Sequence, residues 1–128
     1  MVLDTSAVIA ILQDEPEAPR FISMIEKASV LRISAATLIE TGIVMHARYG
    51  DAGDIEVDQF IQHLKVTVTP VTLDQAEIAR EAYREYGKGN HPAGLNYGDC
   101  FSYALAISTQ EELLFKGEDF AKTDIKSF

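Results

Sequence analysis

The stretch MVLDTSAVIAIL (residues 1–12) places a single aspartate, Asp4, between a short apolar segment and a second apolar run. The pattern predicts a strand over residues 1–4 and a helix over residues 5–12, with the acid at their junction. Aspartate is rarely buried unless it is paired. Asp4 is therefore either an ordinary turn residue or a functional group held at the end of a strand.

Composition sets the frame for the rest of the chain. The 128 residues suit one domain, residues 1–128, and 47% hydrophobic residues supply a core. No apolar run approaches the ~20 residues of a membrane span, and the start lacks the basic segment of a signal peptide. The single cysteine, Cys100, suits a reducing cytoplasm. A net charge of −9 argues against nucleic-acid binding unless some acids hold metal cations.

Strand-like and helical segments alternate along the chain, which predicts an α/β fold with a mainly parallel sheet of four to five strands and helices on both faces. Ser34 is expected to cap one of the helices. Ligands in such folds bind beyond the carboxyl ends of the strands, where Asp4 lies. Further helices are expected over 16–28, 35–49, 55–65, 73–86 and 97–109, and further strands over 30–33, 66–71, 113–115 and 123–125.

Acids recur at unexpected positions. Glu40 shares a helix face with an apolar stripe, Asp99 heads an apolar helix, and Glu118, Asp119 and Asp124 follow the strand at 113–115. Each has an ordinary explanation when taken alone: an edge glutamate, a helix cap and solvated loop acids. The stripe beside Glu40 consists of Ala36, Ile39, Ile43 and Ala47.

The combination favours a metal site. Two carboxylates 4 Å apart repel by ~4 kcal/mol at an effective dielectric constant of 20, so a fold that gathers several needs a cation or must protonate some of them. Ligation by oxygen alone suits Mg²⁺ or Mn²⁺. The three histidines are scattered and no HExxH or CxxC motif is present, which disfavours zinc.

Four motifs carry a resemblance to a known family: MVLDTSAVIAIL, SAATLIETGIV, LNYGDCFSYALA and LLFKGEDF. Together they resemble PIN-domain proteins and, more narrowly, the VapC toxins of bacterial type II toxin–antitoxin pairs. The resemblance covers nearly the whole chain. It implies a PIN-like three-layer α/β/α sandwich that cleaves RNA with Mg²⁺ or Mn²⁺ held by acidic residues.

Carried over from that resemblance, Asp4, Glu40 and Asp99 match the first three family acids. The resemblance implies that Asp4 and Asp99 are the principal metal ligands and that Glu40 binds a second ion or orients the attacking water. Whether one or two ions act stays open. Thr5 and Ser6 match a hydroxyl pair that holds a metal-bound water or supports the first acid.

The fourth acid departs from the family pattern. Gly117 occupies the position where many PIN domains have threonine in a Thr-x-Asp motif. Asp119 is the preferred candidate for the fourth acid, acting through water, and Glu118 is the alternative.

The resemblance also implies partners: an RNA substrate, a VapB-like antitoxin whose C-terminal segment reaches the acidic site, and a second copy of the chain in a homodimer. Lys116, Lys122 and Lys126 flank the predicted site and are candidate phosphate contacts. A groove for the antitoxin is expected to use apolar residues of the early helices: Val8, Ile11, Leu12, Phe21 and Ile25.

Three other classes compete with the nuclease interpretation. A receiver domain needs an aspartate at the end of a middle strand, and the stretch VTVTPVT offers none. A phosphatase of the Asp-x-Asp type is excluded because position 6 is Ser6. A PIN scaffold that binds RNA or a partner without cutting stays open, because the fourth acid is altered.

Overall fold

A computed structural model describes residues 1–125, so Lys126 lies outside the described part of the chain. The helix at 97–109 and the N-cap role of Ser34 agree with the prediction.

No helix within the described residues is both long and apolar enough to cross a membrane. The elements are β1 (Val2–Leu3), α1 (Thr5–Leu12), α2 (Ala18–Lys27), β2 (Arg32–Ser34), α3 (Ala35–Tyr49), α4 (Asp51–His63), β3 (Thr67–Thr69), α5 (Leu73–Tyr86), α6 (Tyr97–Thr109), β4 (Leu113–Leu114) and the 3₁₀ helix η1 (Phe120–Lys122).

The four strands of the described residues form one parallel sheet in the order β3-β2-β1-β4. Val2 pairs with Arg32 on one side and with Leu113 on the other. β1 therefore lies between two neighbours, and the residue that follows it, Asp4, sits at the middle of the carboxyl edge of the sheet. The predicted parallel α/β architecture is confirmed.

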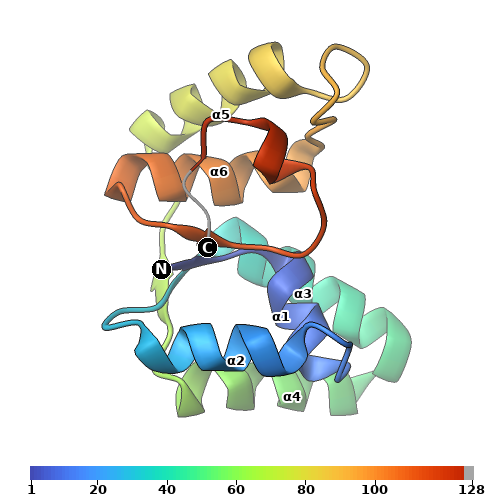
Figure 1. The fold of residues 1–128 in the computed structure, drawn as a ribbon. Helices are drawn as coiled ribbons and strands as arrows, with labels where there is room; N and C mark the ends of the chain where they lie inside the picture. The colour runs from blue at the N-terminus through green and yellow to red at the C-terminus, as the bar shows by residue number, and fades with distance from the viewer. Residues whose placement is uncertain (126–128) are drawn as a thin grey trace.

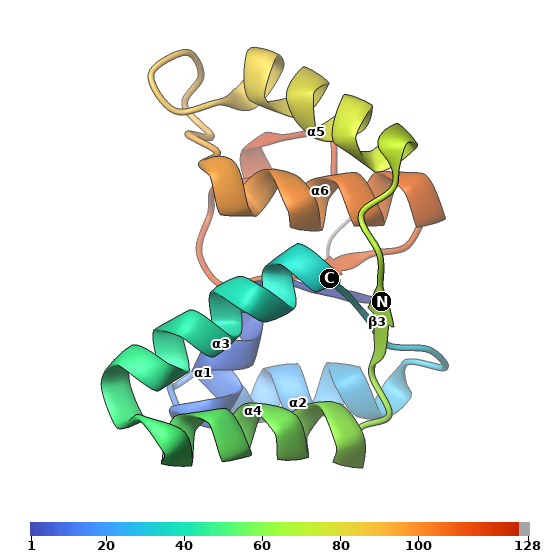
Figure 2. The same ribbon diagram turned by 180° about the vertical axis from the view of Figure 1, so that it is seen from behind.

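Helices cover both faces of this short sheet (Figure 1). Successive strand residues point to opposite faces. Val2 and Leu113 lie in the apolar cluster with α5 and α6, whereas Leu3 and Leu114 lie in the cluster with α1, α2 and α4. Each fully buried side chain of this size stabilises the fold by about 1.5–3 kcal/mol. Figure 2 shows α3 lying between these two helical layers, where it contacts α1, α4 and α6.

One predicted helix begins at a different residue, and one predicted strand is absent from the described residues. The helix expected to begin near residue 55 begins at Asp51, directly after Gly50, whose φ of +60° turns the chain. The strand expected over 123–125 does not form, because the backbone N–H of Ile125 bonds to Thr123 Oγ1 in a local turn.

The expected groove of apolar residues on the early helices is also only partly right. Val8, Phe21 and Ile25 are buried in the core, so they are not available to a partner. Ile11 and Leu12 are half-buried and line a surface groove between α1 and α4.

Candidate metal centre

Asp4 ends β1 and caps α1 at the same time. Its backbone N–H bonds to Leu114 O at 3.0 Å, and its side chain is only 4% exposed. Oδ2 accepts hydrogen bonds from Ser6 N at 3.0 Å and Ser6 Oγ at 2.6 Å. Oδ1 accepts from Ser102 Oγ at 2.6 Å. All three donors are neutral, and no cation pairs with this carboxylate among the ion pairs of the described residues.

Glu40 is positioned by hydroxyl groups from α1 and α3. Thr5 Oγ1 donates to Glu40 Oε1 at 2.7 Å and accepts from Thr41 Oγ1 at 3.1 Å. Thr41 is fully buried. The carboxylate of Glu40 is therefore fixed at one oxygen by a neutral hydroxyl chain that begins inside the protein.

The face of α3 that packs inward differs from the predicted one. The apolar stripe beside Glu40 faces outward, with Ile39 and Ile43 64% and 63% exposed. The buried residues of α3 are instead Thr37, Thr41 and Met45. The spacing of apolar residues predicts that the Ile39–Ile43 face packs inward. The structure instead buries Thr37 and Thr41, whose hydroxyls bond to Ser102 and Thr5.

Asp99 is part of a capping box at the start of α6. Asn96 Oδ1 accepts from Asp99 N at 2.9 Å, and Asp99 Oδ2 accepts from Asn96 N at 3.0 Å. The preceding residue, Gly98, lies directly against the second acid: a Cβ built on it would come 2.4 Å from Glu40 Oε2. α6 therefore brings Asp99 beside Glu40 through a close contact that only glycine permits.

The charges of the other three predicted acids act on the pKa of Asp99. Burial raises the pKa of Asp99 to about 6, against the lowering effect of the hydrogen bond from the Asn96 backbone, and the charges of Asp4, Asp119 and Glu40 raise it further. None of the four acids takes part in an ion pair within the part of the chain that the structure describes. Within residues 1–125, the negative charge of these four acids is thus not offset by an ion pair.

The segment after β4 carries Asp119 and two of the three candidate lysines, Lys116 and Lys122. Asp119, but not Glu118, is among the charges that raise the pKa of Asp99. Gly117 adopts a φ of +93°, a conformation that disfavours a threonine at this position. Lys116 Nζ lies 2.5 Å from Glu15 and 3.1 Å from Glu17. Lys122 is exposed on η1.

The spacing of the carboxylates limits how an ion would bind. Among residues 1–125, no three of the four cleft acids bring oxygen atoms within 4.8 Å of one another. His46, Asp51 and Asp54 do meet that spacing, but they lie at the turn between α3 and α4. There His46 Nδ1 and Asp54 Oδ2 form a hydrogen bond of 2.9 Å at an exposed position, which is an ordinary contact between helix ends.

Sequence reasoning missed the hydroxyl groups that hold the acids. Ser102, Thr37 and Thr41 are all fully buried or nearly so, and each bonds to another hydroxyl or to an acid. The spacing of Thr37 and Thr41, four residues apart on α3, and the polar Ser102 within an apolar helix were the available signals.

Comparison with known proteins fits this architecture. The PIN domain model matches residues 1–126, so the chain belongs to the PIN domain family. It belongs more narrowly to the VapC family within it: the VapC ribonuclease Mb0640 of Mycobacterium bovis is 52% identical over 125 residues, covering 98% of this chain and 95% of that protein. Ribonuclease VapC of Mycolicibacterium smegmatis is 50% identical, with 98% and 97% covered.

Two solved structures share the fold at low sequence identity. VapC20 of Mycobacterium tuberculosis, a Sarcin-Ricin loop cleaving toxin, superposes with a TM-score of 0.78 at 19% identity, covering 97% of this chain and 95% of that one. VapBC2 of Rickettsia felis, bound to a DNA fragment from its promoter, gives 0.78 at 12% identity, with 99% and 96% covered. These likenesses establish the three-layer parallel fold.

Proposed function

We propose that this chain is the toxin of a type II toxin–antitoxin pair and hydrolyses RNA phosphodiester bonds with Mg²⁺ or Mn²⁺. One observation carries the proposal: Asp4, Glu40 and Asp99 come from three separate elements, lie close enough for the charges of Asp4 and Glu40 to raise the pKa of Asp99, and have no basic partner among the described ion pairs. The names of the relatives, which are ribonucleases, support the same activity.

The oxygen atoms left free by hydrogen bonding fit a divalent ion. An ionised carboxylate offers about four lone-pair directions. Within residues 1–125, Asp4 Oδ1 keeps one direction open, and Glu40 Oε2 and Asp99 Oδ1 accept no hydrogen bond. Within residues 1–125, no three of these acids bring oxygens within 4.8 Å of one another, so one ion would contact at most two of them directly and reach the third through the waters that Mg²⁺ or Mn²⁺ retains. Asp119 would then act through such a water.

When bound, the ion would lower the pKa of a water and neutralise charge on the phosphate oxygens. The protein's own task is to hold the acids still. Asp4 is fixed by Ser6 and Ser102, and Glu40 by Thr5, so the oxygens that face the cleft are oriented before RNA arrives. Lys122 is the better placed candidate for a phosphate contact, since Lys116 is already paired with two glutamates.

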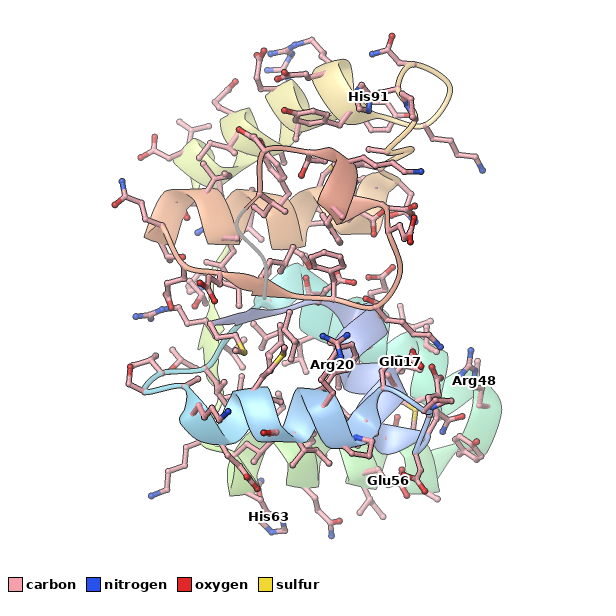
Figure 3. The ribbon with its side chains drawn as sticks, in the orientation of Figure 1. Glu17, Arg20, Arg48, Glu56, His63 and His91 are labelled. Atoms are coloured by element: carbon pink, nitrogen blue, oxygen red, sulfur yellow. The ribbon has the colours of Figure 1, made fainter. Side chains whose placement is uncertain are left out.

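We propose that a VapB-like antitoxin segment docks beside α1. The groove between α1 and α4 presents the half-buried Ile11 and Leu12, and Glu56 and His63 extend from α4 at the lower edge of Figure 3. Such a groove suits the apolar face of a partner helix with a basic residue opposite Glu56. A basic residue at the end of the segment would pair with the cleft carboxylates and compete with the ion.

A homodimer is proposed through the outer face of α3. Ile39 and Ile43 are exposed there, and they line a shallow apolar pocket with Tyr97 and Phe101 of α6. Contiguous exposed apolar surface of this kind marks interaction sites. The patch borders Glu40, so dimerisation would bring two acidic clefts toward one interface.

The ribonuclease proposal is tested with purified protein and total RNA, with and without Mg²⁺ or Mn²⁺. We expect cleavage only with the ion, and loss of cleavage in Asp4→Asn and Asp99→Asn while both variants stay folded. Full activity of either variant at the same ion concentration would refute the proposed mechanism. RNA binding by the wild-type chain without any cleavage would favour the non-catalytic PIN scaffold.

A further inference from the structure

Ser102 is a buried serine of α6 that bonds outside its own helix. Its Oγ lies 2.6 Å from Asp4 Oδ1 and 3.2 Å from Thr37 Oγ1, and both hydroxyl residues are at most 1% exposed. Ser102 Oγ donates to Asp4 Oδ1, so its one hydroxyl hydrogen goes to Asp4. Thr37 must then donate to Ser102, and the hydrogen bonds run in one direction from α3 through α6 to Asp4.

Ordinary helical serines and threonines behave differently. Ser108 and Thr109, later in α6, donate to the carbonyl oxygen of Leu105 in their own helix at 3.1 and 2.7 Å. Such bonds are the local alternative that hydroxyl side chains use within helices. Ser102 instead spans from α6 to the end of β1, which gives it a role in placing Asp4.

The particular oxygen that Ser102 holds is informative. Ser6 occupies both lone-pair directions of Asp4 Oδ2, with its N–H and its hydroxyl. Ser102 occupies one direction of Oδ1, so the remaining open direction of the whole carboxylate, within residues 1–125, lies on that same atom. The oxygen that a cation would use is therefore the oxygen that Ser102 fixes.

We infer that Ser102 is a positioning residue for the divalent ion: with Thr37 behind it, it fixes Asp4 Oδ1 in the orientation that binds the cation. The inference rests on the proposed function, since it assumes that Asp4 is a ligand. Partners that orient a metal ligand typically change metal affinity by 10–100-fold when they are removed. Mg²⁺ demands stricter octahedral geometry than larger ions, so a loosened Asp4 weakens Mg²⁺ more than Mn²⁺.

The test is cation binding without RNA. Calorimetric titration with Mn²⁺, and Mg²⁺ competition against it, would compare the wild-type chain with Ser102→Ala and with Ser108→Ala, a matched control on the same helix. We expect Ser102→Ala to lose about 10–100-fold in Mn²⁺ affinity and more in Mg²⁺ affinity, and Ser108→Ala to match the wild type. Unchanged Mn²⁺ affinity in Ser102→Ala would overturn the inference.

Two further variants separate positioning from a general packing defect. In the Asp4→Asn background, Ser102→Ala should cause no further loss, because the ligand that it positions is already gone; an additional loss of equal size would contradict the inference. Thr37→Ser should bind Mn²⁺ as the wild type does, and Thr37→Val should weaken binding in the same direction as Ser102→Ala. The two Thr37 variants test the inference even if Ser102→Ala folds poorly. Equal Mn²⁺ affinity in Thr37→Val and Thr37→Ser would then overturn the inference.

Failure of the underlying proposal has a different signature. A wild-type chain that binds no Mn²⁺, or that binds it equally after Asp4→Asn, would remove the metal site itself. A wild-type chain whose Mn²⁺ binding depends on Asp4 but not on Ser102 would leave the metal site standing and refute only the role given to Ser102.

Discussion

Replacing Gly98 with alanine would disturb the proposed active site with little change to the fold. Gly98 is the second residue of α6, and a Cβ at this position would lie 2.4 Å from Glu40 Oε2 and 2.8 Å from its Cδ. Ordinary contact begins at 3.4 Å, so the carboxylate must retreat by 3.4 − 2.4 = 1.0 Å. The obstacle is the end of a flexible side chain, so Glu40 moves while the helix stays in place.

The two consequences differ in size. Alanine is favoured over glycine within a helix by roughly 0.5–1 kcal/mol. Displacing Glu40 sacrifices its 2.7 Å hydrogen bond from Thr5, a loss of about 0.5–1.5 kcal/mol. Stability should therefore change by less than about 1 kcal/mol. A 1 Å misplacement of a catalytic group costs about 10²-fold in rate, or about 2.7 kcal/mol of transition-state stabilisation.

The assay pairs RNA cleavage, as kcat/KM at fixed Mg²⁺, with thermal unfolding of the same samples. Gly42→Ala is the matched control, because Gly42 also lies within a helix and a Cβ there would meet nothing within 4 Å. We expect Gly98→Ala to lose about 10²-fold in kcat/KM at a nearly unchanged Tm, and Gly42→Ala to retain activity.

Two results would refute this reasoning. Full activity in Gly98→Ala would mean that the position of Glu40 does not matter for cleavage. A similar loss when Gly98→Ala is added to Glu40→Ala would mean that alanine acts through something other than the displaced carboxylate, because no carboxylate is then left to displace.

Other variants test the charge, the RNA contacts and the dimer. Because burial and the nearby acids raise the pKa of Asp99 from 3.8 to about 6, the folded chain keeps a proton that the unfolded chain has lost, and stability falls as pH rises through that window. Without divalent ions, Asp99→Asn should thus raise the free energy of unfolding at neutral pH by on the order of 1–3 kcal/mol, and this gain should be gone below about pH 4. Urea denaturation at several pH values measures the gain. A gain that does not depend on pH would contradict the reasoning. Lys122→Ala should weaken RNA binding and reduce its salt slope by about 0.7, whereas Lys116→Ala, which removes a lysine already paired with glutamates, should change the slope less; equal effects would contradict the distinction. Ile43→Glu places a charge at a position 63% exposed, so it should leave the monomer folded and abolish the homodimer in sedimentation experiments, and a persistent dimer would place the interface elsewhere.

Much of the fold could be predicted from sequence because its signals are local. The apolar stripe of α6 and its capping residues mark that helix, and Cys100, Tyr103 and Ala104 are buried as its spacing predicts. The alternation of strands and helices predicted the parallel sheet. The start of α4 is not evident from sequence because two glycines, Gly50 and Gly53, are typical of a loop. Gly53 is instead a point of close helix packing, where an added Cβ would lie 2.2 Å from Met45 O.

The site was predictable only as a set of acids. Position after a strand or at a helix start identified Asp4 and Asp99, because topology brings such positions to one edge of the sheet. The contacts that hold the acids depend on how α3 is rotated, and periodicity chose the wrong face. With Ile39 turned outward, Thr37 and Thr41 face inward, and only then can hydroxyls reach Ser102 and Thr5. No local pattern encodes that rotation, since it follows from packing against two other helices.

The net charge of −9 comes from acids at the proposed site and elsewhere on the chain. Some acids away from the site are paired with bases: Glu15 and Glu17 with Lys116, and Glu111 with Arg32 and the terminal ammonium. Within residues 1–125, Asp4, Glu40 and Asp99 accept only from neutral hydroxyl and backbone N–H donors, which fix their positions without cancelling their charge. An RNA phosphate would be repelled from such a cleft, so the same carboxylates that attract a divalent ion make its binding a condition for RNA to approach. Under the proposed function, the arrangement would couple RNA binding to the cation through electrostatics, before any bond is broken.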